Sequence, residues 1–182
     1  TPTEKTYKIS FFYIYKKWEI YHKTSHIASL IVSYINKEED YMNTKWKEEM
    51  PAFIEKTDAF YAGELPMKDY KGFSGFYGSY GQKGGKASML RLRMPCGEVD
   101  KDKLKFVTET FTKHGVKRCH FTTCQTIQLH DLSKEQLYPI MDEALDNGII
   151  FMGGGGDFPR NVMCSPLSGV EEDEYFDVMP YA

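Results

Sequence analysis

The polar residues between positions 120 and 130 have the types and spacing that best fit chemistry in this sequence. In "HFTTCQTIQLHDL", residues 120–132, every second side chain can hydrogen-bond or ligate: His120, Thr122, Cys124, Thr126, Gln128 and His130. The intervening positions are mostly apolar, so an extended strand places the polar set on one face. A solvated sheet face normally carries Lys and Glu, whereas this face carries neutral polar groups between two histidines. The pattern indicates a surface that meets a ligand or a partner.

Two segments with arginine lie on either side of this register in the sequence. Arg91 and Arg93 alternate in "RLR", so a strand projects both to the same side, and the glycine tract of "GGGGDFPRN" leads to Arg160 and Asn161. Arginine binds oxyanions and carboxylates through paired N–H donors and keeps its proton. Together the three clusters predict an anion site. Read singly, arginines in a strand are more often a solvated edge, and histidines in a strand are more often structural.

Two other kinds of site are not predicted. The glycine tract lacks the GK[ST] ending of a phosphate-binding P-loop. Cys119 and Cys124 do not have metal-finger spacing, and strand alternation sends them to opposite faces. We therefore expect no zinc site.

The elements that must position these residues follow from periodicity and from helix end signals. We expect strands over residues 87–95, 116–123 and 126–132, with a tight turn near Cys124 and Gln125. Residues 149–156 are expected to hold the last strand and a glycine loop. Helices capped by Asp100 and Ser133 end at Gly115 and Gly148. Their inward residues are expected to be Leu104, Val107 and Phe111 in the first helix and Leu137, Ile140, Met141 and Leu145 in the second. This order predicts an α+β fold, the ferredoxin-like split βαβ (βαββαβ) half-domain with both helices on one face of an antiparallel sheet.

With the rest of the sequence included, we expect the chain to consist of four regions. Residues 1–41 are a non-native upstream extension or an N-terminal helix, and residues 42–86 hold a helix (residues 46–61) followed by a Gly- and aromatic-rich arm (residues 70–86) without regular structure. Residues 87–152 are the half-domain, and residues 153–182 begin a further domain. Both the arm and residues 161–182 are expected to leave aromatic side chains exposed and prone to association.

Residues 1–41 raise a question about the gene. "KEED", residues 37–40, is encoded by purine-rich codons ahead of Met42, as a translated bacterial ribosome-binding site would be. The hypothesis is that translation natively starts at Met42. The alternative is a genuine helix whose apolar face, formed by Ile27, Leu30, Ile31 and Tyr34, packs on the domain. Pyrimidine-rich codons upstream of codon 42 would contradict the hypothesis.

Composition narrows the class of protein. The 182 residues carry a net charge of -3, so the chain has no basic field of the kind that nucleic-acid binders use. Four cysteines are too few for a disulfide scaffold and suit a reducing cytoplasm. No run approaches the roughly 20 apolar residues of a membrane helix. We expect a cytoplasmic protein that engages neither nucleic acid nor membrane.

Three motifs in this order resemble a known family. "MLRLRMPCG" (residues 89–97), "HFTTCQTIQLHDL" (residues 120–132) and "GGGGDFPRNVMCSPLSG" (residues 153–169) are similar to the MLRxRxPGG, TTRQ…QLH and RNV motifs of the siroheme-dependent nitrite and sulfite reductases. "GFYGSYGQKGGK" (residues 75–86) also resembles the arm that precedes the first motif there. The resemblance covers residues 42–182.

The resemblance implies an oxidoreductase that reduces nitrite or sulfite by six electrons, with ferredoxin or a similar carrier as electron donor. Its cofactors are siroheme and a [4Fe–4S] cluster, and this half-domain forms one wall of the siroheme pocket. By motif position, Arg91 and Arg160 would hold the substrate oxyanion. Siroheme and its many carboxylates would be contacted by Arg91, Arg93, His120, Thr122, Thr123, Cys124, Gln128, His130 and Asn161.

The sequence departs from the family pattern at three points. Cys124 stands where the motif has arginine, which removes one cation from the expected carboxylate contacts. Cys96 stands where it has glycine. The cysteines that hold the cluster are absent from this chain, so it needs the remaining C-terminal part of such an enzyme, and we expect no reduction by this polypeptide alone.

Two other functions remain open on the residues alone. One is a non-catalytic ferredoxin-like module that binds a small anion or a partner domain through its open sheet face. The other is an RNA binder. It is less favoured, because the polar register has no aromatic residues on which bases could stack. Codons downstream that encode C-x5-C and later C-x3-C would favour the enzyme.

Overall fold

The fold is described from a computed structural model, which covers residues 25–156, 158 and 161–181, the side chains of residues 25–40, 42 and 180 excepted. The chain separates into two compact units, residues 1–41 and 42–182. Helix α2 (Ser25–Tyr61) crosses from one unit into the other. The apolar face proposed for residues 27–34 lies outside the described side chains, and the hypothesis of a start at Met42 stays a prediction about the gene.

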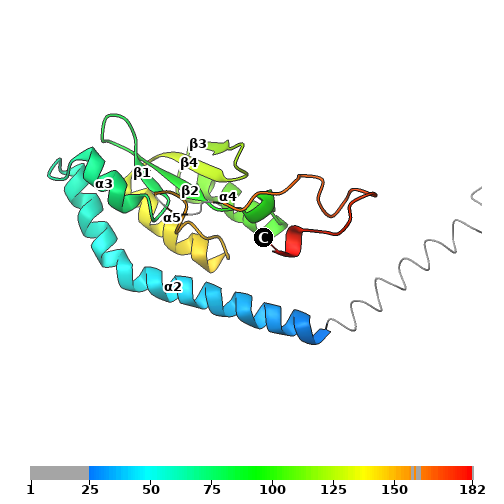
Figure 1. Cartoon of the computed structure of the whole chain (residues 1–182). Coiled ribbons are helices and arrows are strands. Elements are labelled where there is room, and N and C mark those ends of the chain that lie inside the picture. Colours follow the sequence, from blue (N-terminus) through cyan, green and yellow to red (C-terminus); the bar gives the residue numbers. More distant parts are fainter. Residues whose placement is uncertain (1–24, 157, 159–160, 182) are drawn as a thin grey trace, which may run out of the picture. The chain divides into compact units, whose positions relative to one another are not determined.

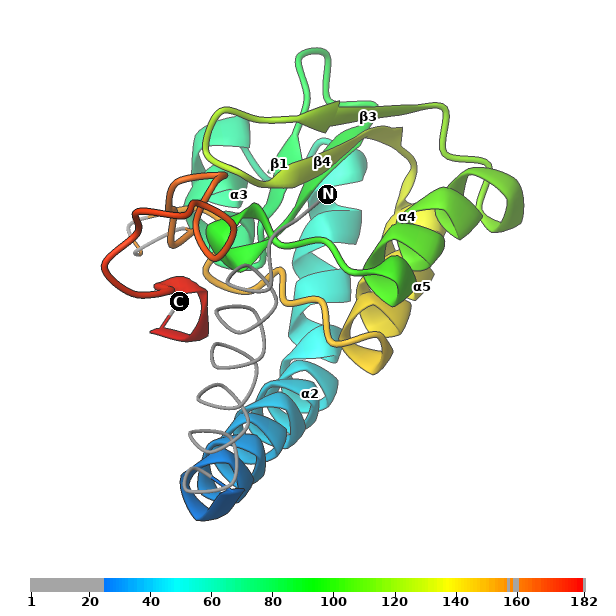
Figure 2. The same ribbon diagram turned by 90° about the vertical axis from the view of Figure 1, so that its right-hand side faces the viewer.

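The unit from residue 42 onward is an α+β fold, as predicted (Figure 1). It contains the end of α2, then α3 (Met67–Ser74), β1 (Ser79–Gly81), β2 (Ser88–Leu92), the short 3-10 turn η1 (Pro95–Gly97), α4 (Lys101–Lys113), β3 (Arg118–Phe121), β4 (Ile127–Leu132), α5 (Lys134–Asp146) and η2 (Met179–Tyr181). The four strands form one antiparallel sheet in the order β1-β2-β4-β3. Figure 2 shows α4 and α5 together on one side of this sheet.

The two covering helices begin and end where the sequence signals them. The Asp100 carboxylate accepts a hydrogen bond from the Lys103 amide at 2.8 Å, and Ser133 forms a capping box with Gln136. Beyond the ends of these helices, Gly115 and Gly148 adopt φ values of 67° and 65°. This left-handed backbone favours glycine and stops the helix.

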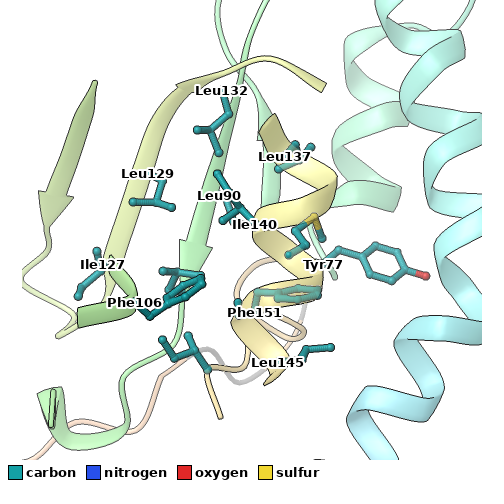
Figure 3. Packing of buried hydrophobic residues seen from close by; sticks show 14 of the residues in the cluster. Tyr77, Leu90, Phe106, Ile127, Leu129, Leu132, Leu137, Ile140, Leu145 and Phe151 are labelled. Atoms are coloured by element: carbon teal, nitrogen blue, oxygen red, sulfur yellow. The ribbon is translucent and has the colours of Figure 1, made fainter. Parts of the chain in front are cut away.

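The core lies between the sheet and the helices (Figure 3). Leu90 and Leu129 project into it from the strands, and all four inward residues predicted for α5 are buried. The inward stripe predicted for α4 was partly wrong. Phe106, Val107 and Thr110 are buried in α4, whereas Leu104 is 48% exposed. A lone exposed leucine costs little, so the register of α4 is set by Phe106.

The arm of residues 70–86 is not the irregular segment that we predicted. It contains the end of α3 and strand β1, and Tyr70 and Tyr77 are buried. The Tyr70 ring stacks on Phe60 with 4.1 Å between centroids, and Tyr77 contacts Phe53 and Trp46 on α2. The aromatic residues thus find partners on α2, and the expected exposure of the arm is wrong.

The strand predicted within residues 149–156 is also absent. β1 pairs with β2 along the edge where that strand was expected, from Ser79–Leu90 to Gly81–Ser88. Residues 149–153 make only isolated backbone bonds nearby, from Arg93 to Ile150 at 2.8 Å and from Gly153 to Phe76. The glycine tract then turns away with φ of 70° at Gly153 and 71° at Gly156.

Candidate functional site

The sheet face opposite α4 and α5 carries the predicted polar register. Along β2, Leu90 and Leu92 are buried while Met89 and Arg91 point to the opposite, open face. Gln128 lies between Arg91 and His120 in the strand register, because it pairs with Arg91 on β2 and with His120 on β3. The open face therefore brings Arg91, Gln128 and the two histidines side by side.

Arg91 is held in place at the centre of this face. Its Nη1 donates to the carbonyl oxygen of Gly154 at 2.7 Å. With the Gln128 amide oxygen facing the guanidinium, that oxygen accepts from Nη2 at 3.0 Å and from Nε at 3.2 Å. The guanidinium carbon also lies 5.7 Å from the centre of the Tyr80 ring. Three of the five N–H groups are thereby used, which leaves two to bind an anion among the described residues.

The Gln128 amide links Arg91 to His130. Its nitrogen donates to His130 Nε2 at 3.2 Å, which requires an unprotonated Nε2. Burial lowers the pKa of His130, and the positive charge of Arg118 and neighbouring His120 lower it further, against the opposing effect of Asp131. His130 is therefore a neutral group near pH 7. The ring centres of His120 and His130 lie 6.5 Å apart.

Two adjoining hollows share Arg91. A small cavity of about 60 Å³ is lined by Arg91, Thr122, Cys124, Thr126 and Gln128. A larger one of about 420 Å³ is lined by Lys71, Tyr80, Gly81, Gln82, Met89, Arg91 and His130. Among the residues that the structure describes, neither lining contains a carboxylate. Both hollows suit an anionic ligand, because an Asp or Glu here would repel it.

The glycine tract is fitted closely to this face. The Tyr80 hydroxyl occupies the position that a Cβ on Gly155 would need, and it accepts a hydrogen bond from the Gly156 amide at 2.8 Å. A Cβ on Gly154 would come within 2.7 Å of the carbonyl oxygen of Phe151. Any larger residue would push the tract away and remove the carbonyl that positions Arg91. Sequence reasoning used the tract only to deliver Arg160 and Asn161.

Four of the predicted site residues that the structure describes do not reach the hollows: Arg93, His120, Thr123 and Asn161. His120 lies beside Gln128 in the strand register but lines neither hollow. Arg93 is half-buried, its Nη1 donates to Met152 at 3.3 Å, and burial lowers its pKa. Thr123 is exposed in the turn closed by the Gln125-to-Thr122 backbone bond of 3.0 Å. The Asn161 amide lies within hydrogen-bonding distance of the carbonyls of Met94, Cys124 and Gln125, at 2.8–3.0 Å. Asn161 therefore joins three backbone segments. Arg160 lies outside the described residues.

Sequence reasoning also missed residues that line the larger hollow. Tyr80 and Gln82 belong to the arm, which was expected to be irregular, and Lys71 belongs to α3. The hairpin formed by β1 and β2 brings them beside Arg91. A usable signal was the Gly-Gly turn at residues 84–85, because such a turn joins paired strands.

Two absences hold for the described part of the chain. No three His, Cys, Asp or Glu side chains converge there as a metal site would require. None of its helices has both the length and the apolar character needed to cross a membrane.

Comparison with known proteins gives a family match over part of the chain. Residues 80–147 match the nitrite/sulfite reductase ferredoxin-like half domain. These residues form such a half domain. They include β2, α4, β3, β4 and α5, and with them Arg91, Gln128 and His130. Arg160 and Asn161 follow the half domain in the chain.

Individual relatives agree with this assignment. The chain is 32% identical over 92 residues to a sulfite reductase [NADPH] hemoprotein beta-component from Staphylococcus carnosus, covering 50% of this chain and 16% of that protein. It is 28% identical over 94 residues to a chloroplastic ferredoxin–nitrite reductase from Zea mays, covering 51% and 16%. The chain thus spans a small part of the length of the curated relatives it matches.

A solved structure shows the same fold. The NirA protein of Mycobacterium tuberculosis superposes with a TM-score of 0.55 at 23% identity, covering 68% of this chain and 26% of that one. At this identity the likeness establishes the fold alone.

Proposed function

We propose that the open sheet face of the half domain forms one wall of a siroheme and substrate pocket in a nitrite or sulfite reductase. The observation that carries the proposal is Arg91, which Gly154, Gln128 and Tyr80 hold at the centre of an open face. The two hollows of this face are lined, within the described part of the chain, by no carboxylate. A polycarboxylate macrocycle and a small oxyanion both need such a surface. When bound, siroheme and a [4Fe–4S] cluster supply the electrons and the iron at which the oxyanion is reduced.

The residues of this chain would bind and orient. Arg91 has two N–H groups left for carboxylate or oxyanion oxygens. Gln128 keeps the guanidinium in the plane that permits this contact, and the neutral His130 adds a polar group without a competing charge. Because Gly154 and Gln128 hold Arg91 before any ligand arrives, little reorganisation accompanies binding. The expected anion contact of Arg160 belongs to the same proposal.

The complete reaction requires more than this chain. We propose that residues 153–182 begin the siroheme and cluster domain, and that the ligands of the cluster lie in the remaining part of such an enzyme. Ferredoxin or a similar carrier would supply electrons to the whole protein, and the cytoplasm is the proposed compartment. The 182-residue polypeptide alone should reduce neither nitrite nor sulfite.

Titration of the chain with siroheme, followed by absorbance, tests the proposal. We expect saturable binding that Arg91→Met weakens roughly 10-fold, the loss of a charge-assisted hydrogen bond. Lys105→Met is the matched control, because it removes a cation from the exposed side of α4 and should leave affinity unchanged. Equal loss in both variants would indicate a general charge effect and would contradict the proposal.

The same titration distinguishes the proposed siroheme pocket from the alternative function, a module that binds a small anion. A small-anion binding module would be favoured if nitrite, sulfite or phosphate binds through Arg91 and siroheme does not bind. Competition between sulfite and siroheme at Arg91 would support the pocket wall.

A further inference from the structure

Two of the four cysteines meet where the segment after β2 contacts the C-terminal segment. The Cys96 amide donates to the carbonyl of Val162 at 2.8 Å, and Cys164 Sγ lies 3.8 Å from the carbonyl oxygen of Cys96. The Cys164 side chain also lies close enough to raise the pKa of the Cys96 thiol. A third sulfur, Met179 Sδ, is 3.4 Å from Cys164 Sγ. Segments separated by 68 positions in the sequence thus place two thiols together.

Both cysteines are held in this arrangement by neighbouring amides. The Gln125 side chain donates to the Cys164 carbonyl at 2.8 Å and accepts from the Cys164 amide at 3.2 Å. On the other side, the Asn161 amide donates to the carbonyl of Met94 at 2.8 Å. Gln125 itself has a positive φ of 54°, which directs its side chain toward the C-terminal segment. The two thiols therefore start close together, which favours reaction between them.

Cys96 occupies an unusual backbone position. Its φ is 54° and its ψ 13°, in the left-handed region that residues with a Cβ disfavour. The side chain is only 6% exposed and points into the protein. Glycine would adopt this backbone conformation without strain. What cysteine adds at this position is its sulfur, so we attribute the role of the residue to the thiol.

The pair is accessible to a small reagent. A cavity of about 390 Å³ is lined by Cys96, Gly97, Phe121, Gln125, Ser165 and Met179, among others, while Cys164 lies outside this lining. Cys164 is itself partly exposed. A low-molecular-weight thiol or disulfide can enter a space of this size.

We infer that Cys96 and Cys164 form a redox couple that closes to a disulfide by exchange with a small-molecule disulfide. The Cys164 thiolate attacks the reagent, which gives a mixed disulfide on Cys164 and releases one reagent thiol. Cys96, after loss of its proton, attacks the Cys164 sulfur and releases the second. In sum, two protein thiols are oxidised to one disulfide and one reagent disulfide is reduced to two thiols.

The order of attack follows from the environments of the two thiols. Burial, reinforced by the neighbouring Cys164, raises the pKa of Cys96 to about 11. Cys96 is therefore a poor first nucleophile. It becomes reactive only next to a mixed disulfide, as a resolving cysteine does.

Closure would join η1 to the C-terminal segment across α4, β3, β4 and α5. A cross-link over a loop of this length restricts the unfolded chain strongly, so it should raise the melting temperature by roughly 10 °C. It would also fix Asn161 and its neighbours against the loop after β2. The inference stands independently of whether siroheme binds.

Incubation of the full chain with mixtures of oxidised and reduced glutathione tests the inference. We expect a peptide containing Cys96 linked to Cys164 in non-reducing mass spectrometry, together with the higher melting temperature. Cys164→Ala should abolish both. Cys96→Gly should also abolish both, and its reduced form should be at least as stable as the parent, since glycine tolerates the left-handed backbone.

The double variant Cys119→Ser/Cys124→Ser is the matched control, because it removes the two thiols that lie outside the pair. It should keep the linked peptide and the full thermal shift. The inference would be overturned if every disulfide that forms involves Cys119 or Cys124. It would also be overturned if no Cys96–Cys164 disulfide forms at any glutathione ratio. A bond that forms without any thermal shift would overturn the proposed bracing of the C-terminal segment.

Discussion

Strands β2 and β4 carry two different surfaces on their opposite sides. Toward the helices, Leu90, Ile127 and Leu129 are 0–1% exposed and pack into one continuous core (Figure 3). On the open face of the same strands, Arg91, Gln128 and His130 are only partly buried and form one hydrogen-bonded chain. The first surface is buried against helices of its own chain, whereas the second presents polar groups in an arrangement that suits a ligand.

The difference shows that one pair of strands separates stability from binding. Alternation along a strand allows this, because neighbouring residues lie on opposite sides. Substitutions one position apart should therefore have effects of different kinds. Each prediction below tests that separation, in order of decreasing effect.

Leu129→Ala should destabilise the fold by about 2–5 kcal/mol, because it leaves a cavity in a fully buried core. Chemical denaturation followed by circular dichroism measures the change. Gln128→Ala, on the neighbouring position, should change stability by less than about 1 kcal/mol. Similar losses at both positions would show that the open face also serves as core.

Gln128→Glu should lower siroheme affinity roughly 10-fold while folding stability stays near that of the parent. The substitution nearly preserves shape and keeps an acceptor for Arg91, yet it places a carboxylate among groups that would face the carboxylates of the ligand. Absorbance titration and thermal melting measured on the same sample distinguish the two effects. Unchanged affinity would remove Gln128 from the proposed pocket.

Cys124→Arg should raise siroheme affinity several-fold, by the addition of one charge-assisted contact. Cys124 is exposed and lines the cavity of about 60 Å³ beside Arg91, so a longer side chain has room to extend. Cys124→Met adds length without charge and serves as the control. Equal affinities for Arg and Met at this position would show that the cation has no role.

Glu143→Gln should have the smallest effect, about 0.5–1 kcal/mol near pH 7. Burial raises the pKa of Glu143, but hydrogen bonds from Lys113 and His114 outweigh it, and the net pKa lies below the ordinary value. A carboxylate with a lowered pKa stabilises the fold above its unfolded pKa and loses that contribution as pH falls through the folded pKa. The difference between parent and variant should therefore disappear as pH falls through the folded pKa of Glu143. A difference that grows on acidification would contradict the ion-pair assignment.

Much of the open face could be predicted because it depends on alternation alone. Arg91 and Gln128 share a face by strand period, and the helix caps at Asp100 and Ser133 fix where the covering helices begin. Two other predicted site residues lie away from the hollows for a different reason. Arg93 and Asn161 have suitable types, yet each turns its donors to backbone carbonyls of the protein. Residue type does not reveal which acceptor lies nearest.

The sequence by itself determined the α+β order, the ends of α4 and α5, and the polar register of β4, because these follow from local backbone preferences and from the period of the side chains. Only the tertiary structure decided that β1 takes the edge expected for residues 149–156, since that edge goes to whichever segment pairs with β2. It also decided that Leu132 turns inward, because a bulge with Asp131 at φ 60° shifts the register. Finally, it brought Cys96 to Cys164 and Tyr80 to the glycine tract. Such meetings depend on contacts between distant segments, which no local pattern encodes.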